Sequence, residues 1–359
     1  MKRARVVVLF GGKSVEREVS RISARTIAGA LDPAKYDVVP LAVGEDGRFL
    51  PAPHSANLLA EGHVPEKFLA AGEAGQPVSE AVVPSEIGPG RADIVFPIIH
   101  GTTGEDGALQ GFLETLGIPY VGAGVTASAI GMDKAVFKAL LREAGIPTPR
   151  SVPVREADRT ALRDRIEFGL PLFVKPSNGG SSVGVTKVKQ WADLDAALDL
   201  AFRYDDRVLV EEAIDARELE CAVLGNDDPK ASIPGEVVPG HEFYDYDDKY
   251  REDKAKLLIP APVSEAVAGE VRRLAVEAFR LCGISGMARV DFFLERGTDR
   301  VLVSELNTLP GFTAISMYPK LWEASGLPLP KLLDELIRLA LERKERRDRL
   351  SHKPPAELA

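Results

Sequence analysis

The 359-residue sequence has little cysteine, a deficit of positive charge and no long apolar run near its start. Its two cysteines, Cys221 and Cys282, form no CxxC pair, which indicates buried thiols in a reducing compartment, and we expect the cytoplasm. Lys and Arg number 45 against 54 Asp and Glu, and the net charge of −9 argues against nucleic acid or an anionic membrane as the main partner. The apolar run at residues 6–10 is too short for the core of a signal peptide and cannot span a bilayer.

What the chain does contain is typical of a globular protein with an ample core. Hydrophobic residues make up 45% of it and charged residues 28%. A length of 359 residues exceeds that of one ordinary core, so we expect two or three domains. No internal repeat is present.

The first part of the chain has the pattern of a parallel sheet with helices on its faces. Short β-branched runs occur at residues 6–10, 38–43 and 94–99, and a helix-compatible stretch at 20–31 separates the first two. Residues 48–91 are rich in Pro, Gly, Ala and Glu without a sustained period, so we interpret them as an insertion or a long surface excursion.

The rest of the chain alternates helical and extended patterns. Helices are expected at 108–116, 134–144, 191–202, 264–282 and 329–343. Strands are expected at 172–175, 183–187, 208–211, 219–224, 287–294 and 300–307. The polar and aromatic segment at 239–256 is interpreted as a long loop, and long loops in compact enzymes are often lids.

Two short segments match nucleotide-binding signatures only superficially, and we assign neither of them to nucleotide binding. Gly12-Lys-Ser resembles the end of a P-loop, but the earlier glycine that a P-loop requires would fall at Val7, inside the expected strand. Gly122 begins a GxGxxA match, a pattern that occurs often by chance, and a structural turn explains it better.

A stronger phosphate-binding pattern lies at residues 175–184. Lys175 ends an apolar strand and begins a loop with three glycines and three serines, in which backbone N–H groups can approach a polyphosphate while the lysine supplies charge. A plain glycine-rich hairpin is the alternative, and the placement of the lysine favours phosphate. Downstream, Glu211 and Glu218 flank a strand end, and their context alone makes them candidate nucleotide contacts.

The expected hairpin near the C-terminus carries polar side chains on one face. Arg289 and Asp291 share a face of the first strand, as Glu305 and Asn307 do of the second. A turn centred near Gly297 would bring all four together. Two carboxylates and an amide oxygen are hard ligands suited to Mg²⁺. The alternative is a solvated sheet face with paired charges.

Glu16 and His100 each lie just beyond the carboxyl end of an expected parallel strand. Ligands of open α/β sheets bind in the crevice at that edge. A lone histidine is more often structural, but the loop that His100 opens is rich in glycine and polar residues, which favours a functional position.

Seven segments, in order along the chain, resemble the D-alanine–D-alanine ligase family of the ATP-grasp superfamily. They are GGKSVEREVS (11–20), HGTTGEDG (100–107), MDK (132–134), KPSNGGSSVG (175–184), DKY (248–250), ARVD (288–291) and ELNTLPGFT (305–313), which continues to Ser316 and Met317. Each segment is weak by itself, but seven in order over nearly the whole chain are highly specific.

The resemblance implies an α/β (α+β) protein with a three-domain ATP-grasp fold. Residues 1–125 would form an N-terminal Rossmann-like substrate-binding domain with a parallel sheet, 126–215 a central ATP-grasp domain and 216–359 a C-terminal ATP-grasp and catalytic domain. ATP would lie between the last two. Its contacts would be Lys134, Lys175, Gly180, Ser181, Ser182, Glu211, Ile214 and Glu218. Asp291, Glu305 and Asn307 would hold two Mg²⁺ ions, for which Mn²⁺ can substitute.

The implied reaction phosphorylates one D-alanine carboxylate, and the amine of a second D-alanine then displaces phosphate to give D-alanyl-D-alanine for peptidoglycan precursors. Residues implied in substrate binding are Glu16 and His100 at the first D-alanine, Lys249 at the transferred phosphate, and Ser316 and Met317 at the second carboxylate. Arg289 and the Gly311 N–H would stabilise the oxyanion, and Tyr250, Ser181 and Glu16 would form a hydrogen-bonded chain. We expect small-molecule substrates and a homodimer.

Other functions within reach of these residues are a ligase of the same fold that uses D-lactate or D-serine, a different ATP-grasp enzyme, and a non-catalytic small-molecule-binding protein. Tyr250 favours D-alanine as the acceptor, since the D-lactate-using branch typically replaces this tyrosine. A binding protein would have no use for three lysines and three metal ligands at family spacing.

Overall fold

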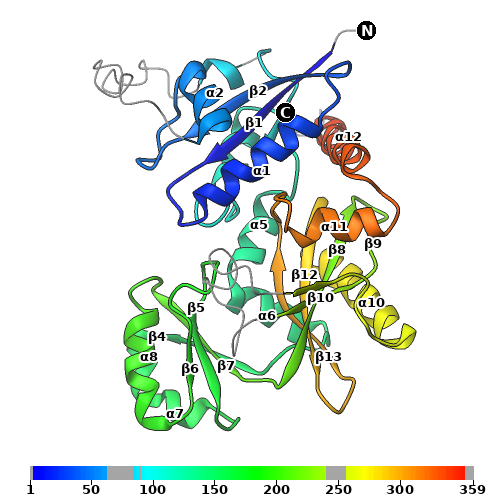
Figure 1. The fold of residues 1–359 in the computed structure, drawn as a ribbon. Coiled ribbons are helices and arrows are strands. Elements are labelled where there is room, and N and C mark those ends of the chain that lie inside the picture. The colour runs from blue at the N-terminus through cyan, green and yellow to red at the C-terminus, as the bar shows by residue number, and fades with distance from the viewer. Residues whose placement is uncertain (1–2, 63–83, 89, 240–255, 352–359) are drawn as a thin grey trace, which may run out of the picture.

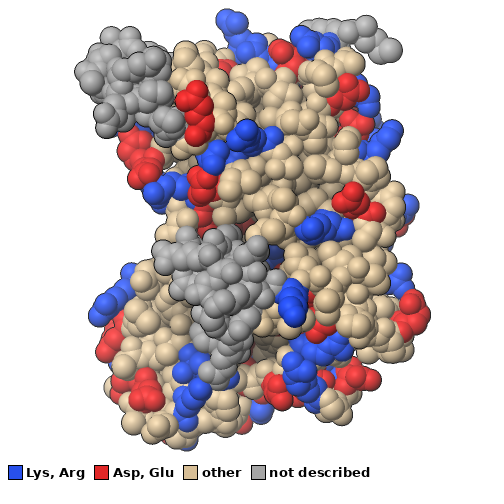
Figure 2. Space-filling view, viewed as in Figure 1, with Lys and Arg blue, Asp and Glu red and all other residues tan. Residues whose placement is uncertain are grey.

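The computed structural model describes residues 3–62, 84–88, 90–239 and 256–351. Three sheets are arranged around the centre of the molecule, one in the upper part of Figure 1 and two in the lower part. Basic and acidic side chains alternate over the face shown in Figure 2. Among the described residues, no helix has the length and apolar composition needed to cross a membrane.

The N-terminal sheet is parallel, as predicted, with the strand order β2-β1-β3. Its strands are β1 (Ala4–Gly11), β2 (Tyr36–Val43) and β3 (Ile94–Pro97). Residues 6–10 of β1 are fully buried because both faces of the sheet are covered. Val6, Val8 and Phe10 enter one apolar core, while Val7 and Leu9 point into another. Helix α1 (Arg17–Ala30) follows β1 and begins with Glu16 at the sheet edge.

Part of the expected surface excursion at residues 48–91 is a helix. Helix α2 (Ala52–Glu61) packs on β2, and the backbone N–H of Ala42 donates to Ser55 Oγ at 3.0 Å. The lack of a sustained period in the sequence therefore did not exclude a helix over these residues. The helix begins after Pro51 and ends at Gly62 in the left-handed conformation, which are ordinary start and stop signals. A short 3₁₀ turn, η2 (Ser85–Ile87), precedes β3. Residues 63–83 and 89 lie outside the described part of the chain.

A four-stranded antiparallel sheet forms the lower left of Figure 1, in the order β4-β7-β5-β6. Its strands are β4 (Ser151–Arg155), β5 (Leu172–Pro176), β6 (Thr186–Val188) and β7 (Arg207–Glu212). The helical elements of this region are η3 (Glu156–Ala161), α7 (Leu162–Arg165), η4 (Trp191–Asp193) and α8 (Leu194–Ala201). Strand β6 is shorter than the predicted 183–187, because Gly184 turns the chain at a φ of +73°. The loop between β5 and β6 is correspondingly long.

The third sheet is antiparallel, in the order β11-β10-β8-β12-β13, with β9 beside β8. Its strands are β8 (Ala216–Gly225), β9 (Lys230–Ala231), β10 (Gly235–Val238), β11 (Lys256–Leu258), β12 (Gly286–Glu295) and β13 (Val301–Asn307). Helix α10 (Glu265–Leu281) covers one face of it. Residues 240–255, nearly all of the expected 239–256 loop, lie outside the described residues.

Helices connect the three sheets. After α4 (Ala108–Thr115), helices α5 (Val125–Met132) and α6 (Lys134–Glu143) contribute Ala127, Phe137 and Leu141 to the core of the third sheet. The last helices are α11 (Met317–Ala324) and α12 (Leu329–Asp348). Leu332 and Leu336 of α12 share a core with the N-terminal sheet. The chain therefore returns to its start, which places the three sheets around one central site.

Candidate active site

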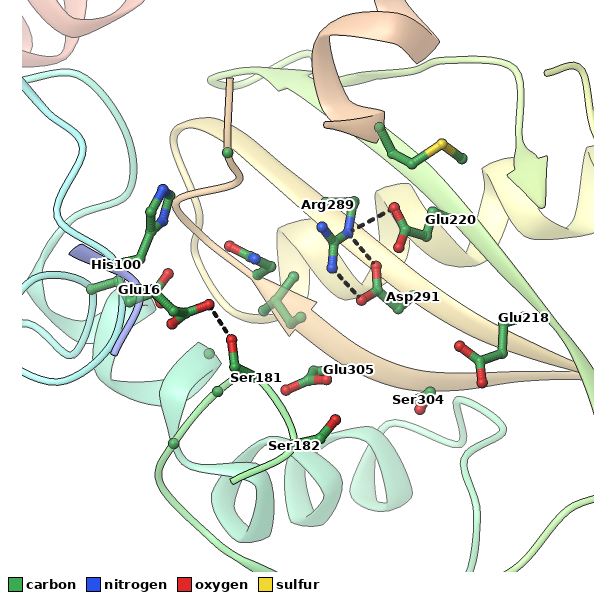
Figure 3. A pocket seen from close by; sticks show the side chains of 18 of the residues that line it. Glu16, His100, Ser181, Ser182, Glu218, Glu220, Arg289, Asp291, Ser304 and Glu305 are labelled. Carbon is green, nitrogen blue, oxygen red and sulfur yellow. Dashed lines mark hydrogen bonds and ion pairs between the residues drawn. The ribbon is translucent and has the colours of Figure 1, made fainter. Parts of the chain in front are cut away.

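A cavity of about 660 Å³ lies where the three sheets meet. Every predicted site residue that the structure describes lines this cavity except Ile214, which is half-buried in the connection between β7 and β8. The predicted residues brought together are Glu16, His100, Lys134, Lys175, Gly180, Ser181, Ser182, Glu211, Glu218, Arg289, Asp291, Glu305, Asn307, Gly311, Ser316 and Met317. Figure 3 shows ten of the lining side chains with labels, drawn from all three sheet regions. Lys249 and Tyr250 lie outside the described residues.

The β5–β6 loop crosses the cavity and reaches the N-terminal sheet. Ser181 Oγ donates to Glu16 Oε1 at 2.5 Å (Figure 3). Ser181 and Ser182 both have positive φ, 51° and 59°, a conformation that non-glycine residues rarely adopt. At Gly180 an added Cβ would lie 3.2 Å from Glu16 Oε2, so a side chain there would crowd the carboxylate. The loop thus lines the cavity with its glycines and with the side chains of Ser181 and Ser182 (Figure 3).

Lys134 lies at the first position of α6, against the same loop. Asp133 caps this helix by accepting from the N–H groups of Ala135 and Val136, each at 3.1 Å. The ammonium of Lys134 donates to the carbonyl of Gly179 at 2.5 Å and lies 3.0 Å from Glu305 Oε1. The cap therefore fixes a lysine between the glycine-rich loop and the C-terminal hairpin.

Lys175 is held by Glu211, which also binds a lysine that the sequence analysis did not select. Lys175 Nζ lies 2.6 Å from Glu211 Oε1, and Lys138 Nζ lies 2.6 Å from Glu211 Oε2. Burial alone would raise the pKa of Glu211, but Lys138 and Lys175 together lower it below its ordinary value. Glu211 is therefore ionised between two ammonium groups.

The hairpin of β12 and β13 brings the four predicted residues into two opposed pairs, although a β-bulge after Asp291 shifts the register nearer the turn. Arg289 is paired with Asn307, and Asp291 with Glu305. The guanidinium of Arg289 donates to both Asp291 oxygens at 2.7 Å and lies 3.1 Å from Glu220 Oε2 (Figure 3). Burial alone would lower the pKa of Arg289, but Asp291 and Glu220 hold it well above its ordinary value. Arg289 and Asp291 form an ion pair, which the alternative interpretation of a solvated sheet face also expected. These side chains line a cavity, however, and not an open sheet face.

The predicted metal ligands offer hard oxygen donors. Asp291 and Glu305 are opposite each other across the two strands, and Asn307 lies two residues further on the same strand. Among the described residues, no group of three or more His, Cys, Asp or Glu side chains is arranged to hold a metal ion. The predicted set contains two carboxylates and one amide, and its donor chemistry fits Mg²⁺. Arg289 and Lys134 now neutralise the two carboxylates.

Two titratable groups, the buried His100 and the half-buried Glu105, lie at the N-terminal edge of the cavity. Burial lowers the pKa of His100, although Glu16 and the backbone of Leu309 oppose the shift, so the imidazole is neutral near pH 7. Burial raises the pKa of Glu105 to about 8, and Glu16 adds to this shift. Glu105 accepts from the backbone N–H of Gly101 at 2.7 Å, which holds the loop after His100 in its turn.

The segment from Gly311 to Met317 ties the hairpin to helix α1. The N–H of Phe312 donates to Ser23 Oγ at 3.0 Å, and the N–H of Thr313 donates to Ser316 Oγ at 2.9 Å. A Cβ at Gly311 would lie 2.8 Å from Ser316 Oγ, which explains the glycine. Ser316 precedes α11, and the first backbone N–H groups of a helix have no acceptor within it and can donate to an anion.

Three cavity-related residues were missed by the sequence analysis. Glu220 lies two residues after Glu218 on the same face of β8, so strand alternation could have indicated it. Lys138 lies one helical turn after Lys134 in α6, a spacing that places both on one side of the helix. Glu105 stood within the polar loop that begins at His100, but no local pattern distinguished it from its neighbours.

Two antiparallel sheets that enclose lysines and a glycine- and serine-rich loop, joined to a parallel-sheet domain, define a ligase of the ATP-grasp class. Family models described as the D-ala D-ala ligase N-terminus and C-terminus match residues 5–123 and 140–338. The chain belongs to the D-alanine–D-alanine ligase family, and the predicted fold class is confirmed.

Individual relatives are similar in sequence or structure to nearly the whole chain. A D-alanine–D-alanine ligase of Thermoanaerobacter sp. (strain X514) is 46% identical, with 95% of this chain and 98% of the relative covered. D-alanine–D-alanine ligase A of Chromobacterium violaceum is 48% identical, with 96% of each covered. The solved D-alanine–D-alanine ligase of Coxiella burnetii is 41% identical with a TM-score of 0.82 and 97% of each chain covered. The VanG D-Ala:D-Ser ligase of Enterococcus faecalis is 34% identical with a TM-score of 0.83, covering 94% of this chain and 100% of that one.

Proposed function

We propose that this enzyme joins two D-alanine molecules to D-alanyl-D-alanine, with ATP as the energy source, for peptidoglycan precursor synthesis. The observation that carries the proposal is the convergence of the predicted residues on one cavity, in a chain whose relatives are named D-alanine–D-alanine ligases. The terminal phosphoryl group of ATP passes to the carboxylate of one D-alanine, and the amine of the other then attacks that acyl phosphate and releases phosphate. Phosphorylation is needed because a carboxylate is a poor electrophile.

Lys134, Lys175 and the loop at residues 180–182 would bind the phosphates of ATP. Two lysines at the cavity and a loop with exposed backbone support this assignment. Glu211, Ile214 and Glu218 would contact the adenine and ribose. The assignment of Ile214 rests on the family resemblance, because its side chain does not line the cavity.

Asp291, Glu305 and Asn307 would hold two Mg²⁺ ions, or Mn²⁺ in their place. The bound cations would offset the repulsion between the phosphate and carboxylate anions. Lys134 and Arg289, which now pair with Glu305 and Asp291, are then available to anionic groups of the substrates.

At the other end of the cavity, Glu16 would orient the ammonium of the first D-alanine, with the neutral His100 beside it. Ser181 holds the Glu16 carboxylate in place through its hydrogen bond. Arg289 and the Gly311 N–H would stabilise the oxyanion that forms when the second amine attacks.

The carboxylate of the second D-alanine would bind Ser316 and the N–H of Met317 at the start of α11. Lys249 would neutralise the transferred phosphate, and Tyr250 would extend the Ser181–Glu16 chain. These last two roles rest on the DKY segment of the sequence.

Two finer assignments complete the proposal. Both cysteines, Cys221 and Cys282, are buried and unpaired, which supports a reducing compartment and thus the cytoplasm. A homodimer is the expected assembly, and light scattering of the purified chain would test it.

The function is tested by phosphate release and chromatographic product analysis with ATP, Mg²⁺ and a panel of D-alanine, L-alanine, D-serine and D-lactate. We expect D-alanyl-D-alanine as the main product with D-alanine alone. Preferential formation of a mixed product when D-serine or D-lactate is present at equal concentration would instead favour the rival ligase. ATP binding without any ligation product would favour a non-catalytic binding protein.

A further inference from the structure

The most deeply buried charge near the cavity belongs to a residue that does not line it. Lys138 lies in the middle of α6 with no exposed surface, whereas Lys175 and Glu211 both line the cavity. The Lys138 ammonium contacts Glu211 Oε2 at 2.6 Å and Thr148 Oγ1 at 3.2 Å. Thr148 in turn donates to the carbonyl of Val303, so a second contact besides Glu211 holds the Lys138 ammonium in place.

The cluster formed by Lys138, Glu211 and Lys175 carries a surplus positive charge, since one carboxylate receives two ammonium groups. Burial of such a surplus is unfavourable unless an anion arrives. Burial lowers the pKa of Lys138 to about 8, and Glu211 opposes the shift. Lys175 is the member of the cluster that reaches the cavity, so an anion in the cavity would neutralise the surplus there.

Lys175 and Lys138 respond differently when an anion binds in the cavity. When the Lys175 ammonium directs its N–H donors to a phosphate, its contact with Glu211 weakens, and only 3% of the Glu211 side chain is exposed. An ionised carboxylate left in that position without a counter-charge would be strongly destabilised. Lys138 cannot follow the ligand, because the protein surrounds it completely.

We propose that Lys138 is a positioning residue that keeps Glu211 paired and correctly oriented when Lys175 leaves it to bind the phosphates of ATP. The proposal deepens the proposed function, since it rests on the phosphate role of Lys175. It also explains why α6 buries a lysine where an apolar side chain of similar length would fill the space without desolvating a charge.

The test is Lys138→Met, which keeps the volume and removes the charge. Glu211 then depends on Lys175 alone, so ATP phosphates must compete with Glu211 for that lysine. Binding of ATP with Mg²⁺ should weaken roughly tenfold or more. Adenosine has no phosphate to draw Lys175 from Glu211, so Lys175 still holds that carboxylate for the adenine and ribose, and adenosine affinity should change less than about threefold. Both affinities are measured by titration calorimetry. Lys344→Met removes one charge from the exposed part of α12 and should change neither affinity.

A double-mutant cycle separates positioning from a general structural role. In a Glu211→Gln background Lys175 is no longer held by a carboxylate, so adding Lys138→Met should not weaken ATP relative to adenosine. Lys138→Gln, which retains one donor toward Glu211, serves if the methionine variant does not fold, and should also weaken ATP selectively.

Equal losses for ATP and adenosine, unchanged ATP affinity, or the same selective loss in the Glu211→Gln background would overturn the proposal. Wild-type protein that binds no ATP would overturn both this inference and the proposed function. Wild-type binding of ATP together with an insensitive Lys138→Met variant would overturn the inference alone.

Discussion

Replacing Glu220 gives the sharpest test of how the cavity works, because the change should lower the rate of the reaction and leave substrate binding nearly unaffected. Its carboxylate lies 3.1 Å from Arg289 Nε, with 9% of the side chain exposed. Asp291 also holds Arg289, through two hydrogen bonds of 2.7 Å. When Asp291 turns to a bound metal ion, Glu220 remains as a carboxylate that holds the guanidinium toward the oxyanion.

The magnitude follows from the contact. A close pair of opposite charges in a buried interface contributes about 1.5 kcal/mol or more, and each 1.4 kcal/mol is roughly tenfold in rate. Glu220→Gln keeps the shape but loses the charge, so we expect kcat to fall about 10- to 100-fold, with the KM values for ATP and D-alanine changed less than about threefold. The melting temperature should change little, since Asp291 still pairs with Arg289 in the free protein.

The assay is steady-state phosphate release with D-alanine, supported by thermal unfolding. Glu218→Gln is the matched control, because Glu218 lies two residues earlier on the same face of β8 and is assigned to the nucleotide. That variant should raise the KM for ATP and leave kcat nearly unchanged. A Glu220→Gln variant with wild-type kcat, or with a loss confined to KM, would refute the reasoning.

Three further predictions follow from the same cavity. Ser181→Ala removes the 2.5 Å bond to Glu16 and should raise the KM for D-alanine about tenfold, with the KM for ATP little changed in initial-rate assays. Glu305→Ala should lower kcat at least about 100-fold while circular dichroism shows an intact fold, and full activity in excess chelator would contradict the metal role. Glu105 has a folded pKa of about 8, above its unfolded value, so it favours the folded state at low pH and this contribution is lost as pH rises toward 8. Glu105→Gln should therefore flatten the fall in stability between about pH 5 and 8, measured by urea unfolding, and an unchanged slope would contradict it.

The sequence predicted best what local geometry decides. The convergence of Arg289, Asp291, Glu305 and Asn307 followed from their odd spacing. They pair as 289 with 307 and 291 with 305, although a β-bulge after Asp291, which the sequence did not indicate, shifts the pairing nearer the turn. The parallel N-terminal sheet followed from unbroken apolar runs, which occur when both faces of a strand are buried. These are properties of one or two neighbouring segments.

Contacts between distant segments were beyond sequence reasoning. Ser181 and Glu16 are 165 residues apart, and Ser23 and Phe312 are 289 apart, so no periodicity within a window could place them together. Lys138 was overlooked because a lysine in an amphipathic helix is ordinarily solvated, and only its approach to Glu211 of β7 makes it a buried partner of a carboxylate.

The ion pairs that line the cavity lead to a last prediction, about how metal binding and nucleotide binding depend on each other. Lys134 pairs with Glu305, and Arg289 pairs with Asp291. Metal alone would take the two carboxylates and leave both cations without their partners, whereas ATP alone would take cations and leave carboxylates unpaired. An unpaired charge in a partly buried site is unfavourable. Only when Mg²⁺ and ATP bind together does each carboxylate gain a metal ion and each cationic side chain gain a phosphate as its new partner. We therefore expect ATP to bind about tenfold or more tightly with saturating Mg²⁺ than without it, and Mg²⁺ to gain the same factor from ATP, because coupling is reciprocal. Calorimetric titrations of each ligand, with and without the other and corrected for the Mg²⁺–ATP equilibrium in solution, measure both factors. Independent binding would show that these ion pairs do not control access to the site.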